Sequence, residues 1–429
     1  EVIENIARIF EKEGADCWFT DDPQKFLGKK YKKDDYIKSS DIVEVWFDSG
    51  ATHSYVLEKR KDLAWPASMY LEGSDQHRGW FHSSLLESCG TRGKAPFKSI
   101  LTHGFVVDGK GLKMSKSTGN IIAPEDVLKK YGADILRVWV AASDYAEDLR
   151  LDYSILEQHA ESYRKIRNTF RFLLGNLKDQ KEDFKLDSKA IEKWPELERY
   201  ILHQIFMLNR NFKKYLKEYN FHKLHKELLN FCSLDLSAFY FDIRKDVLYC
   251  DDLKSPRRKI CINLLTITLD NLLKWFAPIL SFTTEEIFQI LNKEKKSSVH
   301  LENFPDIPLK WEDKKIFEKW EKLKIVRNVT NAAIEVKRSS KDIGSSLEAD
   351  IEVYLGEKYL KLVKDINLSE FFITSHAKAK SMTNSDKFFK IEGVDDIAVS
   401  VKKAEGEKCS RCWKILGNPC GRCSSLLKN

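Results

Sequence analysis

Apolar residues recur every three or four positions between residues 155 and 310, and this spacing predicts a series of amphipathic helices. The first helix has an apolar face and a basic polar face. The apolar face consists of Leu156, Ala160, Tyr163, Ile166, Phe170, Leu173 and Leu177. The polar face holds Arg164, Lys165, Arg167 and Arg171. A second helix is predicted over 197–219, and further helical runs cover 221–241 and 257–276, the last ended by Pro278. Helices of this length and spacing form a bundle. The spacing by itself predicts a packing domain and names no ligand.

The chain before residue 155 alternates strand-like and helix-like segments instead. Strands are predicted over 41–50, where the strand runs into a loop, over 67–73 and over 99–107, with a helix between the last two and a turn at Asp108-Gly109. The order strand, helix, strand predicts a parallel α/β sheet. Such sheets bind ligands at the carboxyl ends of their strands, so we expect the turn at 72–80 and the loop at 110–120 on one rim.

Two shorter regions flank these parts. Residues 2–10 have helical spacing, and residues 21–40 are polar, as in a loop or a surface hairpin. After the bundle, residues 311–403 begin with a charged helix and continue with segments 350–355 and 397–401, whose alternation is typical of half-buried strands. We therefore expect a small α+β unit behind the bundle.

Composition narrows the classes of protein only a little. Hydrophobic residues make up 42% and charged residues 32% of the 429 positions, which is typical of an ordinary soluble protein. The net charge of +7 is compatible with binding to nucleic acid but too small to establish it. No apolar run is long enough to cross a membrane, so we expect no membrane partner.

Four of the nine cysteines form two Cys-x-x-Cys pairs with seven residues between them, namely Cys409, Cys412, Cys420 and Cys423. Four thiolates at this spacing suit tetrahedral Zn²⁺, and because no ligand position is left open the metal would be structural, with one ion per chain. Gly417 and Pro419 would help the intervening loop to turn. The alternative is a pair of redox dithiols. The clustering favours the metal, in a reducing cytoplasm.

His222 and His225 lie three residues apart in a predicted helix, a spacing that invites a second metal interpretation. No cysteine and no pair of carboxylates accompanies them in the sequence. We therefore expect both to be surface or RNA-facing side chains.

Residues 110–120 combine three lysines, glycines, hydroxyl side chains and Asn120. Lysines on a glycine-flanked loop can reach a triphosphate as mobile point charges, and hydroxyls can donate hydrogen bonds to phosphate oxygens. A solvated surface turn could have the same composition. The residue order is more specific, because Lys113-Met114-Ser115-Lys116-Ser117 matches the KMSKS motif of class I aminoacyl-tRNA synthetases.

Three neighbouring segments extend this resemblance. They are Trp46-Phe47-Asp48-Ser49-Gly50, Leu71-Glu72-Gly73-Ser74-Asp75-Gln76-His77-Arg78-Gly79-Trp80-Phe81 and Tyr131-Gly132-Ala133-Asp134-Ile135-Leu136-Arg137. They occur in the order found in isoleucyl-tRNA synthetases, whereas the valyl and leucyl enzymes differ in the second segment. The chain therefore resembles the isoleucyl-tRNA synthetases of bacterial type over nearly its whole length, most densely over 41–175.

The resemblance implies a multidomain chain. Its domains would be a connector after the editing insertion (1–40), the second half of an α/β, Rossmann-like catalytic domain with the lysine loop (41–154), an α-helical anticodon-binding bundle (155–310), a small α+β junction (311–403) and a zinc-binding tail (404–429). The loop between the two cysteine pairs of the zinc-binding tail is shorter than we expect for the family. This difference concerns the contacts of the tail with RNA and not its binding of the metal.

The resemblance also implies roles for individual residues. The adenylate-binding set would be Glu72, Gly73, Asp75 and Gln76, with His103 and Gly104 on the adenine side and Trp46 and Trp80 as walls of an aliphatic pocket. Lys116 would bind the ATP phosphates in the activation transition state, assisted by Lys113, with Mg²⁺ expected. Without the resemblance, Glu72 is equally a surface carboxylate, and either tryptophan equally an ordinary core residue.

Two features of a complete class I enzyme are not found in the sequence. None of the ten histidines lies in a His-x-Gly-His motif, and no editing domain is inserted. One methylene gives a pocket only about 1–3 kcal/mol of discrimination, so selecting isoleucine over valine usually needs that second sieve. We therefore expect the C-terminal portion of a longer, monomeric ligase that uses L-isoleucine, ATP and tRNA(Ile), and we expect this portion to be inactive alone. The alternative is a non-catalytic tRNA-binding protein derived from a synthetase.

Overall fold

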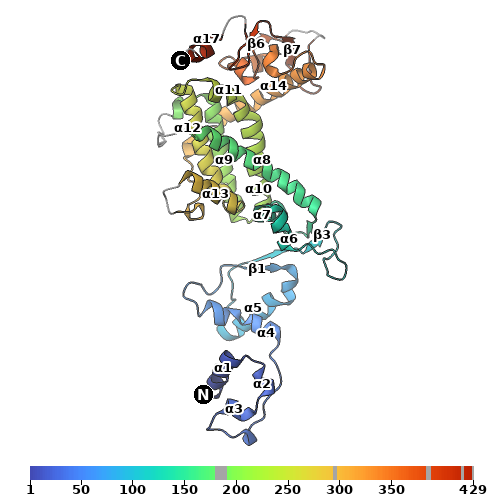
Figure 1. Ribbon diagram of the computed structural model, residues 1–429, viewed down its shortest axis with the longest axis vertical. Helices are drawn as coiled ribbons and strands as arrows, with labels where there is room; N and C mark the ends of the chain where they lie inside the picture. Colours follow the sequence, from blue (N-terminus) through green and yellow to red (C-terminus); the bar gives the residue numbers. More distant parts are fainter. Residues whose placement is uncertain (179–190, 293–296, 383–387, 417–419, 428–429) are drawn as a thin grey trace. The chain divides into compact units, whose positions relative to one another are not determined.

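The structure, a computed structural model, describes residues 1–178, 191–292, 297–382, 388–416 and 420–427 (Figure 1). The sequence also predicts a charged connector over 178–193, after the first long helix, and most of it lies outside these ranges, as do Gly417 and Pro419. The chain divides into two compact units, residues 1–105 and residues 106–429, and each is described by itself.

The first unit contains the predicted strand–helix–strand arrangement. Strand β1 (Tyr70–Gly73) pairs in parallel with β2 (Ile100–His103), and a short 3₁₀ turn, η3 (Ser74–Arg78), leads from β1 into α5 (Trp80–Arg92). The remaining elements of this unit are α1 (Val2–Glu13), α2 (Cys17–Thr20), α3 (Pro23–Leu27), η1 (Lys33–Asp35), α4 (Val45–Gly50) and η2 (His53–Leu57). Residues 21–40 therefore form a loop that contains two short helical turns, and the hairpin alternative is wrong.

The strand predicted at 41–50 is also wrong, because α4 occupies the second half of this segment. The carboxylate of Glu44 caps the helix by accepting a hydrogen bond from the amide of Trp46 at 2.8 Å. At its far end α4 lies so close to α5 that a Cβ on Gly50 would stand 2.3 Å from a carboxylate oxygen of Glu87. The alternation of apolar residues resembles a strand, but a strand also needs a pairing partner, and β1 and β2 are the only paired strands among the residues described in this unit.

The second unit begins with β3 (Val106–Asp108), which pairs in parallel with β4 (Leu149–Leu151). The strand predicted over 99–107 is thus divided in two, because the chain leaves β2 at His103 and enters β3 only at Val106. Helices α6 (Pro124–Tyr131) and α7 (Ala133–Ala142) lie between β3 and β4 in sequence.

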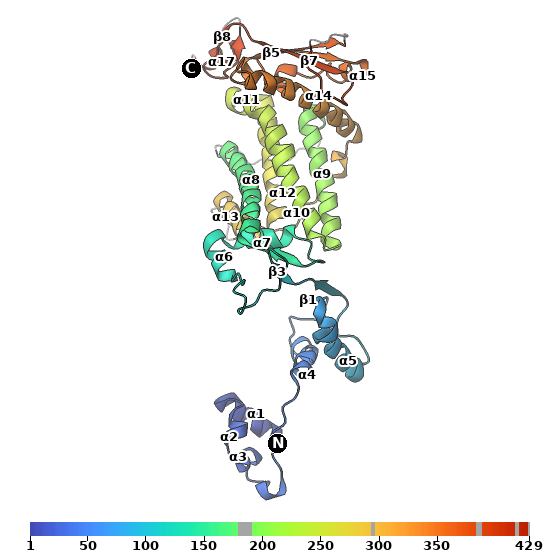
Figure 2. The ribbon, with the colours of Figure 1, turned by 90° about the vertical axis from the view of Figure 1, so that its right-hand side faces the viewer.

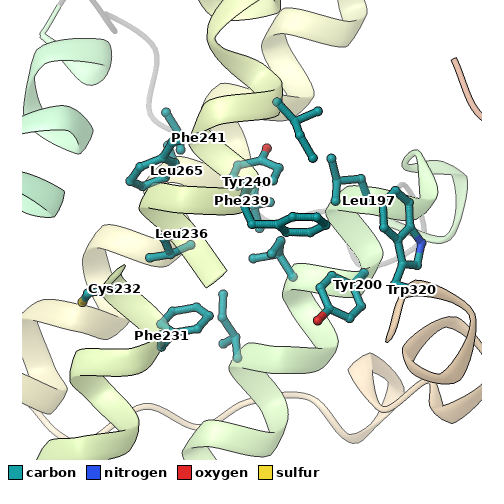
Figure 3. Packing of buried hydrophobic residues seen from close by; sticks show 14 of the residues in the cluster. Leu197, Tyr200, Phe231, Cys232, Leu236, Phe239, Tyr240, Phe241, Leu265 and Trp320 are labelled. Atoms are coloured by element: carbon teal, nitrogen blue, oxygen red, sulfur yellow. The ribbon is translucent and has the colours of Figure 1, made fainter. Parts of the chain in front are cut away.

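The predicted bundle is confirmed. Its helical elements are α8 (Tyr153–Leu177), η4 (Ile191–Lys193), α9 (Glu196–Lys217), α10 (Phe221–Asn230), a π-helical segment η5 (Phe231–Phe241), α11 (Asp242–Cys250), α12 (Pro256–Phe276) and α13 (Ser281–Leu291). Helices α8, α9 and α12 lie side by side in both views (Figures 1 and 2). Figure 3 shows aromatic residues of α9, η5 and α14 packed together, with Tyr200 and Phe239 lying beside Trp320. The apolar periodicity of the sequence therefore marks the buried faces.

The α+β unit is confirmed as well. Helix α14 (Lys314–Ser339) packs against a three-stranded sheet in the order β6-β5-β7, in which β5 (Ala349–Leu355) pairs in parallel with β6 (His376–Ser381) and antiparallel with β7 (Ile397–Lys403) (Figure 2). The smaller elements are η6 (Val299–Leu301), η7 (Leu309–Trp311), η8 (Ser346–Glu348), α15 (Glu357–Leu360), α16 (Leu368–Phe371), β8 (Glu407–Lys408), β9 (Ile415–Leu416) and α17 (Gly421–Leu427).

A buried ion network joins the α+β unit to the bundle. Arg244 of α11 forms a bidentate pair with Glu198 of α9, at 2.6 and 2.8 Å, and its third nitrogen lies 2.6 Å from Glu370 of α16. All three side chains are buried. None of the described helices is long and apolar enough to cross a membrane.

Candidate active-site elements and metal centre

In the first unit, two glycines bring the predicted adenylate-binding residues together. A Cβ on Gly79 would stand 2.4 Å from Oε1 of Gln76 and 2.8 Å from the ring of Trp46, so only glycine permits this approach. The same Gln76 oxygen accepts a hydrogen bond from the amide of Trp80 at 2.8 Å. The turn after β1 therefore places Trp46 of α4 against the start of α5.

Gly73 has the same role at the end of β1. A Cβ on Gly73 would stand 2.6 Å from Oδ1 of Asp75 and 3.8 Å from the ring of His103, which pairs with Gly73 across the two strands. His103 Nδ1 lies 2.8 Å from the carbonyl oxygen of the buried Gly104. The side chain of Glu72 is exposed near the end of the same strand. The polar residues predicted from the family motif thus gather at the carboxyl ends of β1 and β2.

The two predicted pocket tryptophans differ in environment. Trp80 is half-buried, stacks on Tyr70 with ring centroids 4.2 Å apart, and donates from Nε1 to the carbonyl oxygen of Ser49 at 2.9 Å. Trp46 is 45% exposed. Trp80 therefore packs as a core residue on one ring face, whereas Trp46 presents much of its apolar surface to solvent.

In the second unit, the lysine loop is held by two polar side chains. Oδ1 of Asp108, the last residue of β3, accepts hydrogen bonds from the amides of Lys110 (3.0 Å) and Leu112 (2.8 Å). Asn120, at the end of the loop, donates to Oδ2 of Asp108 at 2.9 Å and accepts from the amide of Ser115 at 2.9 Å. Hydrogen bonds from these donors lower the pKa of Asp108, and the bond from the Asn120 side chain contributes most. The loop is therefore closed at its base by Asp108, just before it, and Asn120, at its end.

The cations of this loop are free. Lys110, Lys113 and Lys116 are exposed, and among the residues described here no carboxylate forms an ion pair with any of them. Sequence reasoning missed a fourth cation, Arg150 of β4, whose guanidinium would lie 3.7 Å from a Cβ on Gly111. Gly111 has a φ of +84°, which favours glycine. The strand pairing, not any sequence motif, brings Arg150 to the loop.

The predicted residues are thus divided between the two units. Those of β1, β2, α4 and α5 belong to the first unit, and the lysine loop belongs to the second. We expect the turn at 72–80 and the loop at 110–120 to lie on one rim. That expectation concerns the placement of the two units, and it stays a prediction.

The four cysteines of the tail are gathered as predicted. Their four Sγ atoms all lie within 4.8 Å of one another, and Sγ of Cys412 lies 3.9 Å from Sγ of Cys420. A tetrahedral zinc with bonds of about 2.3 Å would hold its sulfurs about 3.8 Å apart, so the geometry fits that metal. Burial raises the pKa of Cys409, but the backbone donors at Cys412 and Arg411 outweigh it and lower that pKa to about 7. This favours the thiolate at Cys409, whereas burial raises the pKa of Cys412 and of Cys423, so these two thiols would lose their protons only on binding a metal.

The cysteine cluster is docked on the bundle by residues that the sequence did not single out for it. Arg422 forms a bidentate pair with Asp246 of α11, at 2.6 and 2.8 Å, and lies 3.0 Å from Asp251. Burial raises the pKa of Asp246, but the Arg422 guanidinium outweighs it and holds that pKa below its usual value. Cys250, at the end of α11, is buried against Cys412. A fifth cysteine therefore lines the cluster from outside.

The expectation for His225 is wrong. Its side chain is 4% exposed, and burial, aided by the charge of His159, lowers its pKa to about 4. His222 is half-buried and lies 4.0 Å from Asp144. His225 lies three residues before the buried Leu228, and therefore on the apolar side of α10.

Comparison with known proteins matches two parts of the chain to two family models. Residues 1–152 match the family described as tRNA synthetases class I (I, L, M and V), and residues 198–355 match the anticodon-binding domain of tRNA ligase. The chain is 63% identical over 421 residues to the isoleucine–tRNA ligase of Pelagibacter ubique, covering 98% of this chain and 45% of that protein. It is 45% identical over 416 residues to the isoleucine–tRNA ligase of Brucella abortus, covering 96% of this chain and 42% of that protein.

The chain therefore spans less than half the length of the relatives it matches. The matches include the turn after β1, the lysine loop and most of the bundle, which are the features that the geometry singled out. Over the matched residues the chain belongs to the class I aminoacyl-tRNA synthetases, and it is similar to the isoleucine–tRNA ligases over nearly all of its sequence.

Proposed function

We propose that this chain belongs to an isoleucine–tRNA ligase, which activates L-isoleucine with ATP and transfers it to tRNA(Ile). The observation that carries the proposal is the lysine loop, whose base is closed by Asp108 and Asn120 while Lys110, Lys113 and Lys116 have no described carboxylate partner. Exposed cations without a carboxylate partner among the described residues, on a loop whose backbone is held at its base, suit a polyanionic ligand. The domain boundaries given by the family resemblance are included in the same proposal.

In this reaction the isoleucine carboxylate attacks the α-phosphorus of ATP, and pyrophosphate leaves. No protein nucleophile is needed, so the protein contributes position and charge. Lys116, with Lys113 beside it, stabilises the negative charge that develops on the phosphates, and Mg²⁺ would neutralise some of it. Glu72, Gly73, Asp75 and Gln76 at the end of β1 hold the adenylate, and His103 and Gly104 contact its adenine side. Trp46 and Trp80 line the side-chain pocket.

The four cysteines would hold one structural Zn²⁺, since all four ligands come from the protein and no position stays open for substrate. The metal would supply folding energy to a tail that has little core of its own. A reducing cytoplasm, in which the thiols stay free, suits this site. The ligase would act as a monomer.

ATP–pyrophosphate exchange tests the proposal. The complete protein that contains this chain should exchange in the presence of isoleucine, and Lys116→Ala should lower kcat by about 10²–10³, as the loss of one transition-state donor does in other enzymes. Lys129→Ala removes an exposed lysine of α6 and serves as the matched control. Exchange with valine or leucine but not isoleucine would refute the specificity, and this chain alone should not exchange.

The second candidate, a tRNA-binding protein without chemistry, is favoured by the size of the helical region compared with the two short parallel strand pairs. Binding of tRNA(Ile) by a complete protein that shows no exchange with any amino acid would support it. The closed lysine loop argues against it, because a binding module has no use for such a loop.

A further inference from the structure

A cavity of about 420 Å³ lies within the second unit, between α7, α9, α10 and the end of α12. Helix α7 lies beside α10 at one end of the bundle in both views (Figures 1 and 2). The volume falls in the range of about 300–1,000 Å³ that is typical of sites for small molecules. None of the residues assigned to isoleucine activation lines this cavity. The proposed function therefore gives it no role.

The floor of the cavity is apolar. Phe212 of α9, Leu224 of α10 and Trp275 of α12 line it, and all three are buried. The indole nitrogen of Trp275 donates a hydrogen bond to Oδ1 of Asn209 at 3.2 Å, so the polar atom of this ring is already used inside the bundle. The floor therefore offers aromatic rings and aliphatic carbons, which bind apolar groups and hold water poorly.

The walls of the cavity are also apolar, and they reach the solvent. Leu216 and Phe221 are half-buried, and Val140 of α7 is 49% exposed. The described residues that line the cavity include no aspartate and no glutamate. An ammonium group would find no carboxylate there, and burying an unpaired charge is costly. The cavity therefore does not suit an amino acid such as the substrate of the ligase.

Arg137 of α7 is the one charged residue among the described residues of the lining. Its Nε donates to the carbonyl oxygen of Ile279 at 3.1 Å, and a terminal nitrogen donates to the carbonyl oxygen of Pro278 at 2.6 Å. These bonds hold the guanidinium at the rim and use two of its five N–H groups. No carboxylate in the described ranges forms an ion pair with it.

Asp134 lies one turn before Arg137 on α7, but its carboxylate is bound elsewhere. It accepts hydrogen bonds from the amides of Phe282 and Thr283, at 3.2 and 2.8 Å, and from the Thr283 hydroxyl at 2.6 Å. These donors belong to α13, and neither residue lines the cavity. The positive charge at the mouth of the apolar cavity is therefore not neutralised by this neighbour.

We propose that the cavity binds an amphipathic carboxylate, with an aromatic or branched aliphatic body on Phe212, Leu224 and Trp275 and with its carboxylate on Arg137. A guanidinium and a carboxylate form charge-assisted hydrogen bonds in bidentate geometry, and a guanidinium that is already held loses little freedom on binding. The ligand would link α7 to the bundle, because the cavity has walls from both. The proposal does not depend on the proposed function, since ATP, isoleucine and tRNA take no part in it.

Isothermal titration calorimetry of the full chain with 2-naphthylacetate and with its uncharged amide, 2-naphthylacetamide, tests the proposal. The two probes share an aromatic body, so the ratio of their dissociation constants measures the contact with the carboxylate. The wild-type chain should bind the acid about 10–100 times more tightly, the factor that a hydrogen bond to a charged group contributes. L-isoleucine should not displace the acid. Equal binding of the two probes, or binding of neither, would overturn the proposal.

Two variants locate the site. Arg137→Gln should remove the preference for the acid and keep the binding of the amide. Lys217→Gln is the matched control, because it removes an exposed cation next to the lining residue Leu216, and it should keep the wild-type ratio. Ala141→Phe should fill part of the cavity from α7 and weaken both probes by about tenfold or more.

Thermal unfolding shows whether each variant is folded. A folded Arg137→Gln protein that still prefers the acid, or a folded Ala141→Phe protein that binds both probes as the wild type does, would overturn the proposal. If Arg137→Gln does not fold, the ratio measured on the wild-type chain, together with Ala141→Phe, still decides.

Discussion

The burial of His225 predicts a pH-dependent loss of stability in the bundle. His225 is 4% exposed on α10, its Nε2 has no hydrogen-bond partner among the described residues, and burial lowers its pKa from 6.5 to about 4. The partly buried His159 contributes to the same shift through its charge. Protonation is therefore unfavourable in the folded bundle and ordinary in the unfolded chain.

The sign and size of the change in the free energy of unfolding with pH follow from proton linkage. Between pH 6.5 and pH 4 the unfolded chain binds a proton at this position that the folded protein does not bind, so the free energy of unfolding falls as the pH falls. Above pH 6.5 both states are neutral and the full stability is present. Lowering the pKa from 6.5 to about 4 corresponds to about 3.4 kcal/mol in total, of which about 2.5 kcal/mol is lost by pH 4.5.

Urea unfolding followed by far-ultraviolet circular dichroism at pH 7.0 and 4.5 measures this loss. The wild-type protein should lose about 2.5 kcal/mol more than His225→Leu, which has no proton to bind at this site. Leu224→Ala, a buried neighbour on the same helix, should cost about 2–5 kcal/mol at both pH values and keep the wild-type pH dependence. Equal pH dependence in wild type and His225→Leu would refute the reasoning.

Three further predictions concern other contacts. Glu198→Ala should lower the free energy of unfolding by about 3–5 kcal/mol because it removes the bidentate partner of the buried Arg244 and leaves that guanidinium only Glu370, whereas Glu198→Leu combined with Arg244→Met should cost much less. Urea denaturation measures both, and equal costs would contradict the account. Asn120→Ala should open the lysine loop, so that trypsin cleaves there several-fold faster while the circular dichroism spectrum is unchanged; an unchanged cleavage rate would argue against the closure. Fresh protein should contain about one zinc per chain, and removal of that zinc by a chelator should expose Cys250 to alkylation. Arg422→Ala should speed the loss of zinc, and a zinc content of zero in fresh protein would contradict the site.

Features whose signal is local could be predicted from the order of residues alone. Helical periodicity marked the bundle, because each helix must bury one face whatever it packs against. The lysine loop and the two Cys-x-x-Cys pairs were recognisable because their chemistry depends on spacing along the chain. The same local rule led to the wrong strand at 41–50, since alternation alone does not tell whether a pairing strand is present.

The distant residues that complete these features are set by tertiary contacts. Arg150 reaches the lysine loop through the pairing of β3 with β4, and Arg422 finds Asp246 and Asp251 on a helix far away in sequence. His225 is buried because its side of α10 faces the core, although its own residue type suggested the surface. Ion pairs, burial and pKa shifts depend on neighbours that folding brings together, and for this physical reason no spacing rule along the chain could specify them.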